Sequence, residues 1–357
     1  MLDKIASDRL KILRFPLIVG VVFIHAYVTD VGFSNEVIGS GHNGWLLTFI
    51  RDLVSRGVAR IAVPLFFLMS GYFFFLGLKW SLTNYKAKLK SRINSLLIPF
   101  LFWNILTLLV YAAAQYLPVT QIYFSGKSSP ISEFRVYDYL NALIGINSYP
   151  ISYQFWFIRD LMVLVVLSPM FFLIINYVPM IFLGVVSALW FVDFWPVYIP
   201  SSSAILFFYI GALMAISGGS LFRFDSNGNK ILILYILILL IDVLTKGGLY
   251  NAYIHKTGIL FGIASALYIT QFALNNKKIS SFLLWSSNTS FFVFAIHEPF
   301  LTITRKIVYK LLEPNSETML LALYVSIPIV VIAVSMYIYV LLMSLNSRFV
   351  VLISGGR

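Results

Sequence analysis

The sequence predicts an all-α integral membrane protein, a bundle of about ten transmembrane helices with the N- and C-termini in the cytoplasm. Three observations predict this class. Of the 357 residues, 60% are hydrophobic and only 11% are charged, whereas soluble domains are about 45–50% apolar and about 25% charged. Apolar stretches of about 20 residues, the length that crosses the hydrocarbon core, recur along the chain. The aromatic share of 17% fits aromatic belts at the membrane interfaces.

Ten apolar stretches are predicted to span the membrane. They cover residues 11–29, 58–78, 94–116, 154–176, 178–194, 201–217, 231–246, 254–273, 283–303 and 318–343. The fifth to seventh are short, so nine or eleven spans are alternatives, with breaks expected at Gly184, Pro196 or Gly211, or between Gly247 and Gly248. The polar segment 117–153 contains EFRVYDYLNALIGI, which is expected to form a short surface helix.

The basic residues set the predicted orientation, because cytoplasmic loops are enriched in Lys and Arg. With the N-terminus inside, fifteen of the 26 basic residues fall on the cytoplasmic side, including the cluster KWSLTNYKAKLKSR at 79–92. The net charge of +12 therefore indicates membrane topology rather than nucleic-acid binding. The charged start MLDKIASDRLK lacks the pattern of a cleaved signal peptide, so the first span is expected to remain.

No appended soluble domain and no repeat of fixed period is evident, so a single membrane domain over residues 1–357 is expected. The chain has no cysteine, which excludes disulfides and thiolate chemistry. The loops are too short for a separate enzyme, and any chemistry is expected among the helices. An ionisable side chain at membrane depth costs about 3 kcal/mol or more unless it is paired or faces water, so four stretches with such residues are candidate sites.

The first stretch is RFPLIVGVVFIHAY, residues 14–27. Arg14 and His25 are eleven residues apart, which places them on one face of a helix and about 16 Å apart along its axis. A cofactor that enters from the cytoplasm could contact both. The alternative makes Arg14 an ordinary positive-inside anchor and His25 a hydrogen-bonded packing residue, and the spacing alone does not decide between them.

The second stretch is RGVARIAVPLFFLMSGYFFF, residues 56–75. Arg56 and Arg60 are one turn apart at the outer end of the second span, where an anionic or hydroxyl-rich ligand would suit them. Interfacial anchoring is an equal alternative. Ser70 and Gly71 are expected to permit close approach of another helix.

The third stretch is QFWFIRDLMVLVVLSP, residues 154–169. Adjacent helical residues point about 100° apart, so Arg159 and Asp160 are expected to pair elsewhere rather than with each other. Arg60 with Asp160 is one option. The alternative to a site role is a structural ion pair that joins two helices.

The fourth stretch is NTSFFVFAIHEPF, residues 288–300. His297 and Glu298 are adjacent within the ninth span, at nearly the depth expected for His25. An imidazole beside a carboxylate in an apolar helix is costly, so at least one of them is expected to belong to a site.

Other ionisable residues suggest no site. Asp242 and Lys246 have the i,i+4 spacing of a structural pair, and no role is assigned to His42 and His255. His25, His297, Glu298 and Asp160 could in principle hold a metal, but they come from separate helices without an HExxH-type spacing, so no metal is expected.

Together these four stretches resemble the acyltransferase-3 family of integral membrane acyltransferases, which are common in bacteria. The resemblance is carried by Arg14 and His25 with ten residues between them, by a PLFF..SGY segment after an arginine, by a WF.RDL…LSP segment and by a late H.P segment. The matching residues are Arg60, Pro64, Phe66, Phe67, Ser70, Gly71, Tyr72, Trp156, Phe157, Arg159, Leu161, Pro169, His297 and Pro299. The family usually has an aliphatic or tyrosine run before the late histidine, where this chain has FFVFAIH.

The resemblance implies transfer of an acyl group, usually acetyl from cytoplasmic acetyl-CoA, to a hydroxyl of an envelope glycan or its lipid-linked precursor in the bacterial cytoplasmic membrane. His25 would then act as the general base or form a transient acyl-imidazole, and Arg14 would hold the donor phosphate or thioester carbonyl. The basic residues Lys86, Lys88, Lys90 and Arg92 would attract the CoA phosphates, with plain topology determination as the alternative.

On the acceptor side, the same interpretation has five residues orient the glycan: Arg60, Arg159, Asp160, His297 and Glu298. Membrane lipids are expected partners, nucleic acid is not, and a homo-oligomer is compatible with the sequence. Two other classes remain as alternatives. A proton-coupled carrier or glycan exporter would be supported by inverted repeats, and none is evident. A membrane sensor or scaffold would not need Arg14 and His25 on one face.

Overall fold

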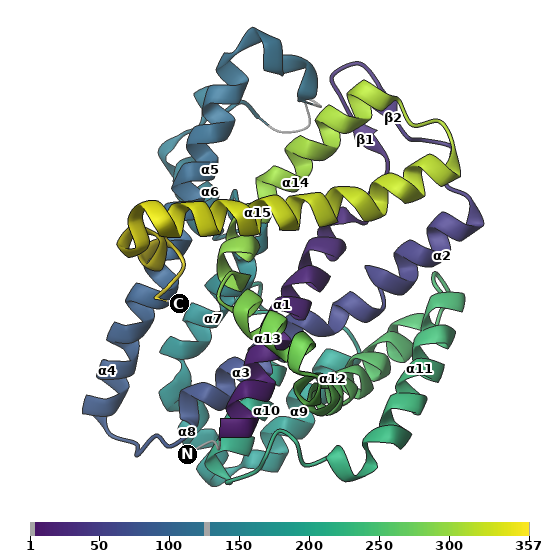
Figure 1. Ribbon diagram of the computed structural model, residues 1–357. Coiled ribbons are helices and arrows are strands. Elements are labelled where there is room, and N and C mark those ends of the chain that lie inside the picture. Colours follow the sequence, from purple (N-terminus) through teal and green to yellow (C-terminus); the bar gives the residue numbers. More distant parts are fainter. Residues whose placement is uncertain (1–3, 125–128, 357) are drawn as a thin grey trace. The chain divides into compact units, whose positions relative to one another are not determined.

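The computed structural model of the chain describes residues 4–124 and 129–356 (Figure 1). Its α-helices are α1 Lys4–Ala26, α2 Trp45–Val54, α3 Ala62–Phe75, α4 Leu82–Arg92, α5 Ile98–Tyr116, α6 Val136–Ile144, α7 Trp156–Val166, α8 Ser168–Tyr177, α9 Pro179–Phe191, α10 Ser202–Ile216, α11 Gly228–Leu244, α12 Asn251–Asn275, α13 Lys277–Ser287, α14 Ser290–Leu312 and α15 Glu317–Ile353. Short helical turns are η1 Val58–Ile61, η2 Ile93–Leu97, η3 Pro118–Tyr123, η4 Ile131–Glu133, η5 Tyr153–Phe155 and η6 Asp225–Asn227. A two-stranded antiparallel hairpin pairs β1 Val31–Gly32 with β2 Val37–Ile38.

The helical class predicted from the composition is confirmed, and each of the ten predicted stretches coincides with helix. Within the described residues, five helices are long and apolar enough to cross a membrane, or seven if two bent pairs each count as one span. The bent pairs are residues 153–177, with a bend of 60°, and residues 277–312, with a bend of 65°. The count of ten spans and the cytoplasmic placement of the termini stay predictions.

The chain divides into two compact units. Unit 1 comprises residues 1–21, 52–93 and 157–290, and unit 2 comprises residues 22–51, 94–156 and 291–357. Each unit is assembled from segments that are far apart in the sequence. The expectation of one membrane domain over the whole chain stays a prediction.

In unit 1, α3 and α10 pack closely because glycine lies at their contact. A Cβ atom on Gly71 would lie 2.0 Å from the carbonyl oxygen of Phe208, and one on Gly211 would lie 2.0 Å from that of Leu68. Such distances exclude any side chain larger than hydrogen. The close approach predicted from Ser70 and Gly71 is therefore confirmed.

The breaks expected inside the short spans are wrong at two positions. Helix α9 runs through Gly184 and α10 runs through Gly211 without interruption. A lone glycine weakens a helix by only about 1 kcal/mol, and at Gly211 the close contact with α3 makes the small residue useful. Pro196, Gly247 and Gly248 lie in the connections between helices.

Also in unit 1, α11 and α12 are consecutive antiparallel helices that lie side by side (Figure 1). The basic segment before α5 forms α4, whose first turn is capped by the Ser81 hydroxyl, which accepts from the Asn84 amide at 3.1 Å. Trp80 stacks on Phe172 with 4.4 Å between ring centroids. Aromatic packing of this kind holds the start of α4 against α8.

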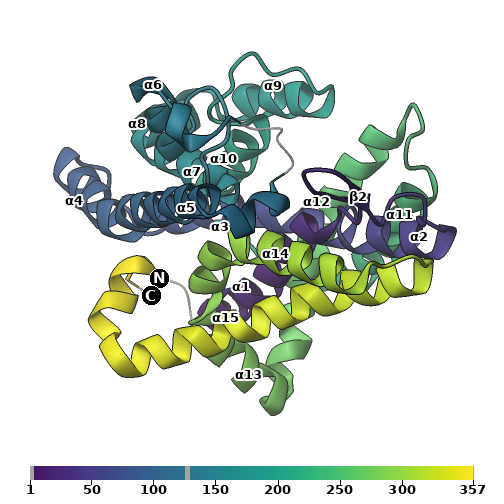
Figure 2. The ribbon, with the colours of Figure 1, turned by 90° about the horizontal axis from the view of Figure 1, so that it is seen from above.

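In unit 2, α15 is the longest helix, drawn in yellow in Figure 2, and it bends near its C-terminal end, where Asn346 has non-helical backbone angles. The indole of Trp103 on α5 donates to the carbonyl oxygen of Ile353 at 3.0 Å. The predicted surface helix within 133–146 is confirmed as α6, which ends at Gly145 in the left-handed conformation that glycine tolerates.

Candidate active site

His25 is the next-to-last residue of α1, and its backbone is held from α14. The guanidinium of Arg305 donates to the carbonyl oxygen of Val28 at 3.0 Å and to that of His25 at 3.5 Å. The last carbonyls of a helix lack partners within the helix, and a cation there is favourable. Arg305 therefore fixes the end of α1 that carries His25.

Two side chains from distant parts of the sequence lie beside this histidine within unit 2, and a third contacts one of them. The ring of His25 lies 5.3 Å from that of His297 and 4.8 Å from that of Tyr153, measured between centroids. The Tyr153 hydroxyl donates to Oε1 of Glu298 at 3.1 Å. We call His25, His297, Tyr153 and Glu298 the histidine cluster.

The imidazole of His297 is fully buried, and its two nitrogens differ in their contacts. Nδ1 lies 2.6 Å from the carbonyl oxygen of Phe294, one turn earlier on α14. A carbonyl only accepts, so Nδ1 carries the proton and Nε2 carries a lone pair. Nε2 has no hydrogen-bond partner among the described residues. A buried basic nitrogen without a partner is a candidate acceptor for a substrate hydroxyl.

A break in α14 positions Glu298. Pro299 has no N–H, so the carbonyl of Ala295, four residues earlier, loses its helical donor. The side-chain amide of Gln154 supplies this donor at 3.1 Å and also donates to the carbonyl of Glu298 at 3.0 Å. Glu298 itself has non-helical backbone angles. The Gln154 amide thus fixes the backbone of Glu298, and the Tyr153 hydroxyl fixes its carboxylate.

The Glu298 carboxylate is 3% exposed and has several polar neighbours. Besides the Tyr153 hydroxyl, Thr302 and Arg305 interact with it electrostatically. A buried carboxylate needs such partners to stay in place.

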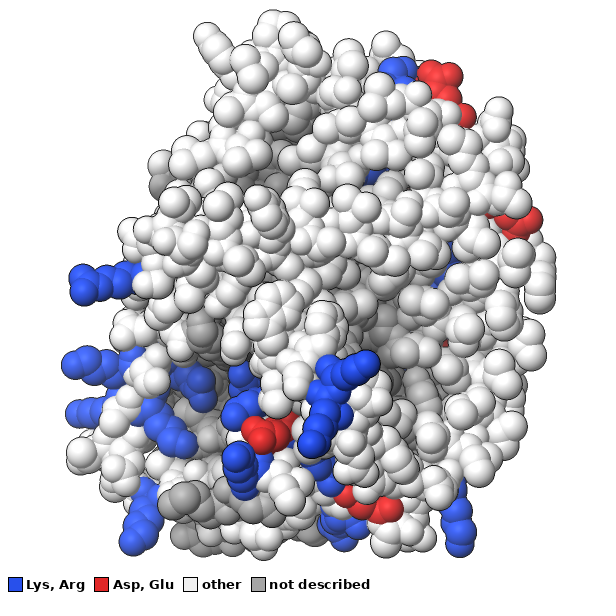
Figure 3. Space-filling view, viewed as in Figure 1, with Lys and Arg blue, Asp and Glu red and all other residues white. Residues whose placement is uncertain are grey.

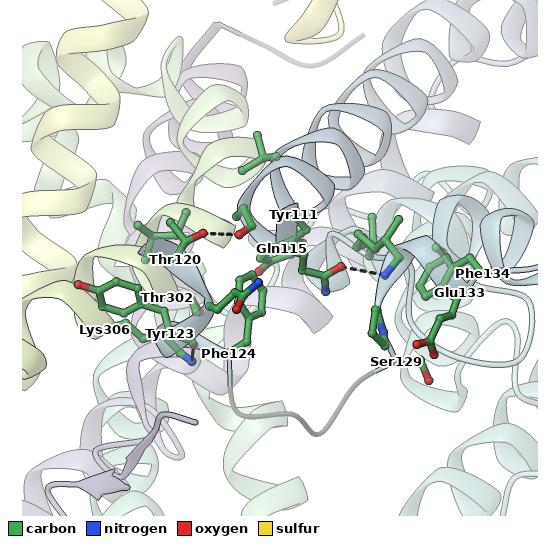
Figure 4. Close-up of a pocket in the computed structure, with 18 of the residues that line it drawn as sticks. Tyr111, Gln115, Thr120, Tyr123, Phe124, Ser129, Glu133, Phe134, Thr302 and Lys306 are labelled. Atoms are coloured by element: carbon green, nitrogen blue, oxygen red, sulfur yellow. Dashed lines mark hydrogen bonds between the residues drawn. The ribbon is translucent and has the colours of Figure 1, made fainter. Parts of the chain in front are cut away.

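A cavity of 1170 Å³ in unit 2 adjoins the histidine cluster through Thr302, which lines it (Figure 4). We call it the unit 2 cavity. Its aromatic lining residues are Tyr111, Tyr123, Phe124, Phe134 and Tyr149. Its amide and hydroxyl lining residues are Ser34, Gln115, Thr120, Gln121, Ser129, Asn141, Ser148 and Thr302.

Two polar contacts shape the walls of this cavity. The Gln115 side chain accepts from the amide of Ile131 at 2.8 Å, which is drawn in Figure 4. The Lys306 ammonium donates to the carbonyl of Gly32 at 2.9 Å and lies near the face of Phe33. Aromatic faces with hydrogen-bonding groups between them suit a ligand that has both apolar faces and hydroxyls.

The predicted donor-side residues all lie in unit 1. Arg14 is half-buried on α1, and α4 carries Lys86 exposed and Lys88 and Arg92 half-buried. The Lys88 ammonium donates to the carbonyl of Phe74. Figure 3 shows Lys and Arg side chains gathered over α4 and the start of α1. Binding of CoA by these residues stays a prediction.

The expectation that Arg159 and Asp160 do not pair with each other is wrong. Nη2 of Arg159 lies 3.1 Å from Oδ1 of Asp160, and both residues are buried. Their Cα–Cβ bonds diverge, but the long arginine side chain brings its guanidinium back to the neighbouring carboxylate. Asp160 also accepts from the amide of Ser201 at 2.8 Å, which ties α7 to the start of α10. Acceptor binding by this pair stays a prediction.

The structural pair predicted at Asp242 and Lys246 is confirmed at 2.7 Å. Lys246 follows the end of α11, and burial lowers the pKa of its ammonium while the Asp242 carboxylate opposes that shift. His255, to which no role was assigned, also contacts Asp242, at 3.0 Å. Arg60 lies in a pocket with Lys246 and His255.

Within residues 4–124 and 129–356, no group of three or more His, Asp or Glu side chains is placed to hold a metal ion. The expectation of no metal stays a prediction.

Sequence patterns pointed to three members of the histidine cluster but missed Tyr153, Gln154 and Arg305. One signal was available: Pro299 leaves the Ala295 carbonyl without a helical donor, which calls for a polar side chain from elsewhere. Nothing in the local sequence identifies Gln154 as that side chain.

Comparison with known proteins places this geometry in context. Residues 7–340 match the family model described as an acyltransferase domain, of the acyltransferase-3 type. A stretch of 186 residues is 28% identical to the succinoglycan biosynthesis protein ExoH of Rhizobium meliloti (strain 1021), covering 50% of this chain and 45% of that relative. The comparison with solved structures gave no match.

Proposed function

Because the chain belongs to the acyltransferase-3 family, we propose that it transfers an acyl group, acetyl from acetyl-CoA, to a hydroxyl of a cell-envelope glycan or its lipid-linked precursor in the bacterial cytoplasmic membrane. The observation that carries the proposal is the histidine cluster, in which His297 and Glu298 are buried and His25 and Tyr153 are half-buried, together with the unit 2 cavity that Thr302 lines. The partial match to a succinoglycan biosynthesis protein supports a glycan as acceptor.

In the proposed reaction an imidazole takes the proton of the acceptor hydroxyl, and the oxygen attacks the thioester carbonyl carbon. The C–S bond then breaks, the ester forms, and the CoA sulfur receives the proton from the imidazolium. Histidine suits this role because its ordinary pKa lies near neutrality. We assign the base to His25. We prefer general-base catalysis, with both substrates bound at once, to a mechanism that passes through an acyl-imidazole.

His297 is the second candidate for the base, because its Nε2 lone pair is without a partner among the described residues. In either assignment, Tyr153 and Glu298 act as positioning residues that hold the cluster through the hydrogen bond between them. Arg305 contributes by fixing the end of α1.

The donor and acceptor are proposed to bind through different residues. Arg14 and the cations of α4 (Lys86, Lys88 and Arg92) would bind the CoA phosphates, because arginine forms paired hydrogen bonds with phosphate oxygens. The unit 2 cavity would bind the glycan, with tyrosine faces against sugar rings and amides and hydroxyls toward sugar hydroxyls.

The test is an acyl-transfer assay on the purified full chain. The protein is incubated with acetyl-CoA labelled in the acetyl group and a membrane glycolipid extract, and both acylated product and CoA release are measured. We expect both. Folded protein that gives neither would contradict acyl transfer and favour transport.

Variants locate the base. His25→Ala should lower turnover by about 10²–10⁴-fold, the usual contribution of a general base. His42→Ala is the matched control, because His42 is exposed in the loop before α2. Wild-type turnover by a folded His25→Ala protein would overturn the assignment. Loss in His297→Ala alone would move the base to His297.

A further inference from the structure

A second, smaller pocket lies in unit 1, at the connection between α11 and α12. It has a volume of 390 Å³, and four basic side chains line it: Arg56, Arg60, Lys246 and His255. The other lining residues are small or uncharged, and no carboxylate lines the pocket. We call it the basic pocket.

The carboxylates that balance this charge lie behind the basic pocket. Asp242 is 2% exposed and accepts from Nζ of Lys246 at 2.7 Å and from Nδ2 of Asn251 at 3.0 Å. His255 Nδ1 lies 3.0 Å from the other oxygen of Asp242. The buried Asp242 carboxylate therefore holds the side chains of Lys246, Asn251 and His255 in place at the wall of the basic pocket.

A similar arrangement holds the arginine side of the pocket. Asp52 is buried and lies 3.4 Å from Nη1 of Arg56, whose side chain is 40% exposed. Arg60, one turn further along the chain, is exposed. The two carboxylates that contact these cations, Asp52 and Asp242, are not among the residues that line the pocket, so its lining presents basic side chains to a ligand.

The basic pocket also lies at a particular place along the chain. Helices α11 and α12 are both long and apolar enough to cross a membrane, so the loop that joins them lies at the membrane surface. Phosphate groups of lipid headgroups lie in that interfacial layer on either side of the hydrocarbon core. Gly247, Gly248 and Ala252 line the pocket with little side-chain volume and leave it open.

We propose that the basic pocket binds a phosphate group, carried by a lipid at the membrane surface or by a soluble phosphate compound. The cations come from two separate segments and converge on one volume, which suits a tetrahedral phosphate with oxygens in several directions. A guanidinium forms paired, charge-assisted hydrogen bonds with such oxygens. The proposal does not depend on acyl transfer.

The test measures binding by calorimetry to the purified full chain in a neutral maltoside detergent, without acetyl-CoA. The probes are dioctanoyl phosphatidic acid, inorganic pyrophosphate and, as a phosphate-free control, dioctanoylglycerol. We expect saturable binding of the phosphatidic acid and none of dioctanoylglycerol. Equal binding of pyrophosphate would support the site with a soluble compound as its source, whereas weaker binding would support a lipid source.

Variants assign the binding to this pocket. Arg56→Gln and Arg60→Gln should each weaken binding by about tenfold or more, because a charge-assisted hydrogen bond contributes that much. Lys230→Gln is the matched control, an exposed cation at the opposite end of α11. Melting temperatures of all variants verify folding.

Two results would overturn the proposal. One is no binding of either phosphate probe to the wild-type chain. The other is a loss in Lys230→Gln as large as that in Arg60→Gln, which would mean general attraction to a basic surface. Because binding is measured without the acyl donor, failure here leaves the acyl-transfer test unaffected.

Discussion

The side chain of Gln154 supplies hydrogen-bond donors to backbone carbonyls of α14 at the place where Pro299 interrupts this helix. Its amide nitrogen donates to the carbonyls of Ala295 and Glu298, which lie on either side of the interruption caused by Pro299. Both carbonyls lie in the buried part of unit 2, where an unpaired backbone acceptor is costly. One side chain therefore stabilises the backbone that carries His297 and Glu298.

Gln154→Leu should destabilise the protein by about 1–3 kcal/mol, because it keeps the volume but leaves two buried acceptors without this donor. The measurement is thermal or denaturant unfolding of the purified protein in detergent. Gln121→Leu is the control, since Gln121 is exposed. Equal stability of Gln154→Leu and the wild type would show that water or another group satisfies these carbonyls.

At the residue scale, the sequence predicted what a local pattern can indicate. The spacing of Arg14 and His25, and the cost of His297 and Glu298 in an apolar stretch, were readable without a structure. Tyr153 and Arg305 were not, because their partners are more than a hundred residues away. The pairing of Arg159 with Asp160 was predicted wrongly, since Cβ directions do not determine where a guanidinium lies.

At the scale of elements, the crossing of α3 and α10 depends on two glycines. The carbonyl of Phe208 would lie 2.0 Å from a Cβ atom on Gly71, and a backbone atom cannot move aside as a flexible side chain can. Any larger residue must push the two helices apart. Close helix approach of this kind is a main source of association within membranes.

Gly71→Ala should therefore destabilise the protein by about 1–3 kcal/mol, the usual cost of overpacking. Gly184→Ala on α9 is the matched control, because a Cβ there would meet nothing within 4 Å. That change should raise stability by roughly 0.5–1 kcal/mol, the helical preference for alanine. Melting temperatures in detergent compare the two, and an unchanged value for Gly71→Ala would contradict the close crossing.

Apolar stretches of similar length became either nearly continuous or bent helical segments. The stretch 318–343 lies within the single helix α15, and the stretch 94–116 became the end of η2 followed by α5. The stretch 154–176 instead became α7 and α8 with a bend of 60°. Length and hydropathy indicate that a stretch lies in a membrane, but they carry little information on whether its helix is straight or bent. Pro169 lies in the first turn of α8, where proline is compatible with either a straight or a bent helix.

At the scale of the whole molecule, the asymmetry of charge predicts which side each loop faces. The chain has no native cysteine, so single introduced cysteines can report on this without a background signal. Ser91 on α4 and Ser132 in the segment before α6 are both exposed serines, which cysteine replaces at similar size.

In intact bacteria, Ser132→Cys should react with a membrane-impermeant maleimide, and Ser91→Cys should react only after the membrane is permeabilised. This result follows if basic loops are cytoplasmic. Activity of both variants in the acyl-transfer assay serves as the control for folding. The reverse labelling pattern would invert the predicted topology and place the predicted donor-side residues outside.

The interleaving of the two units has a consequence for the gene. The last segment of the chain, residues 291–357, belongs wholly to unit 2, and unit 1 is complete by residue 290. A premature stop codon in that last stretch would therefore leave the coding information for every residue of unit 1 intact. The same stop, placed before codon 297, would remove His297 and Glu298, so a truncated allele would keep the predicted donor-side residues and lose half of the histidine cluster.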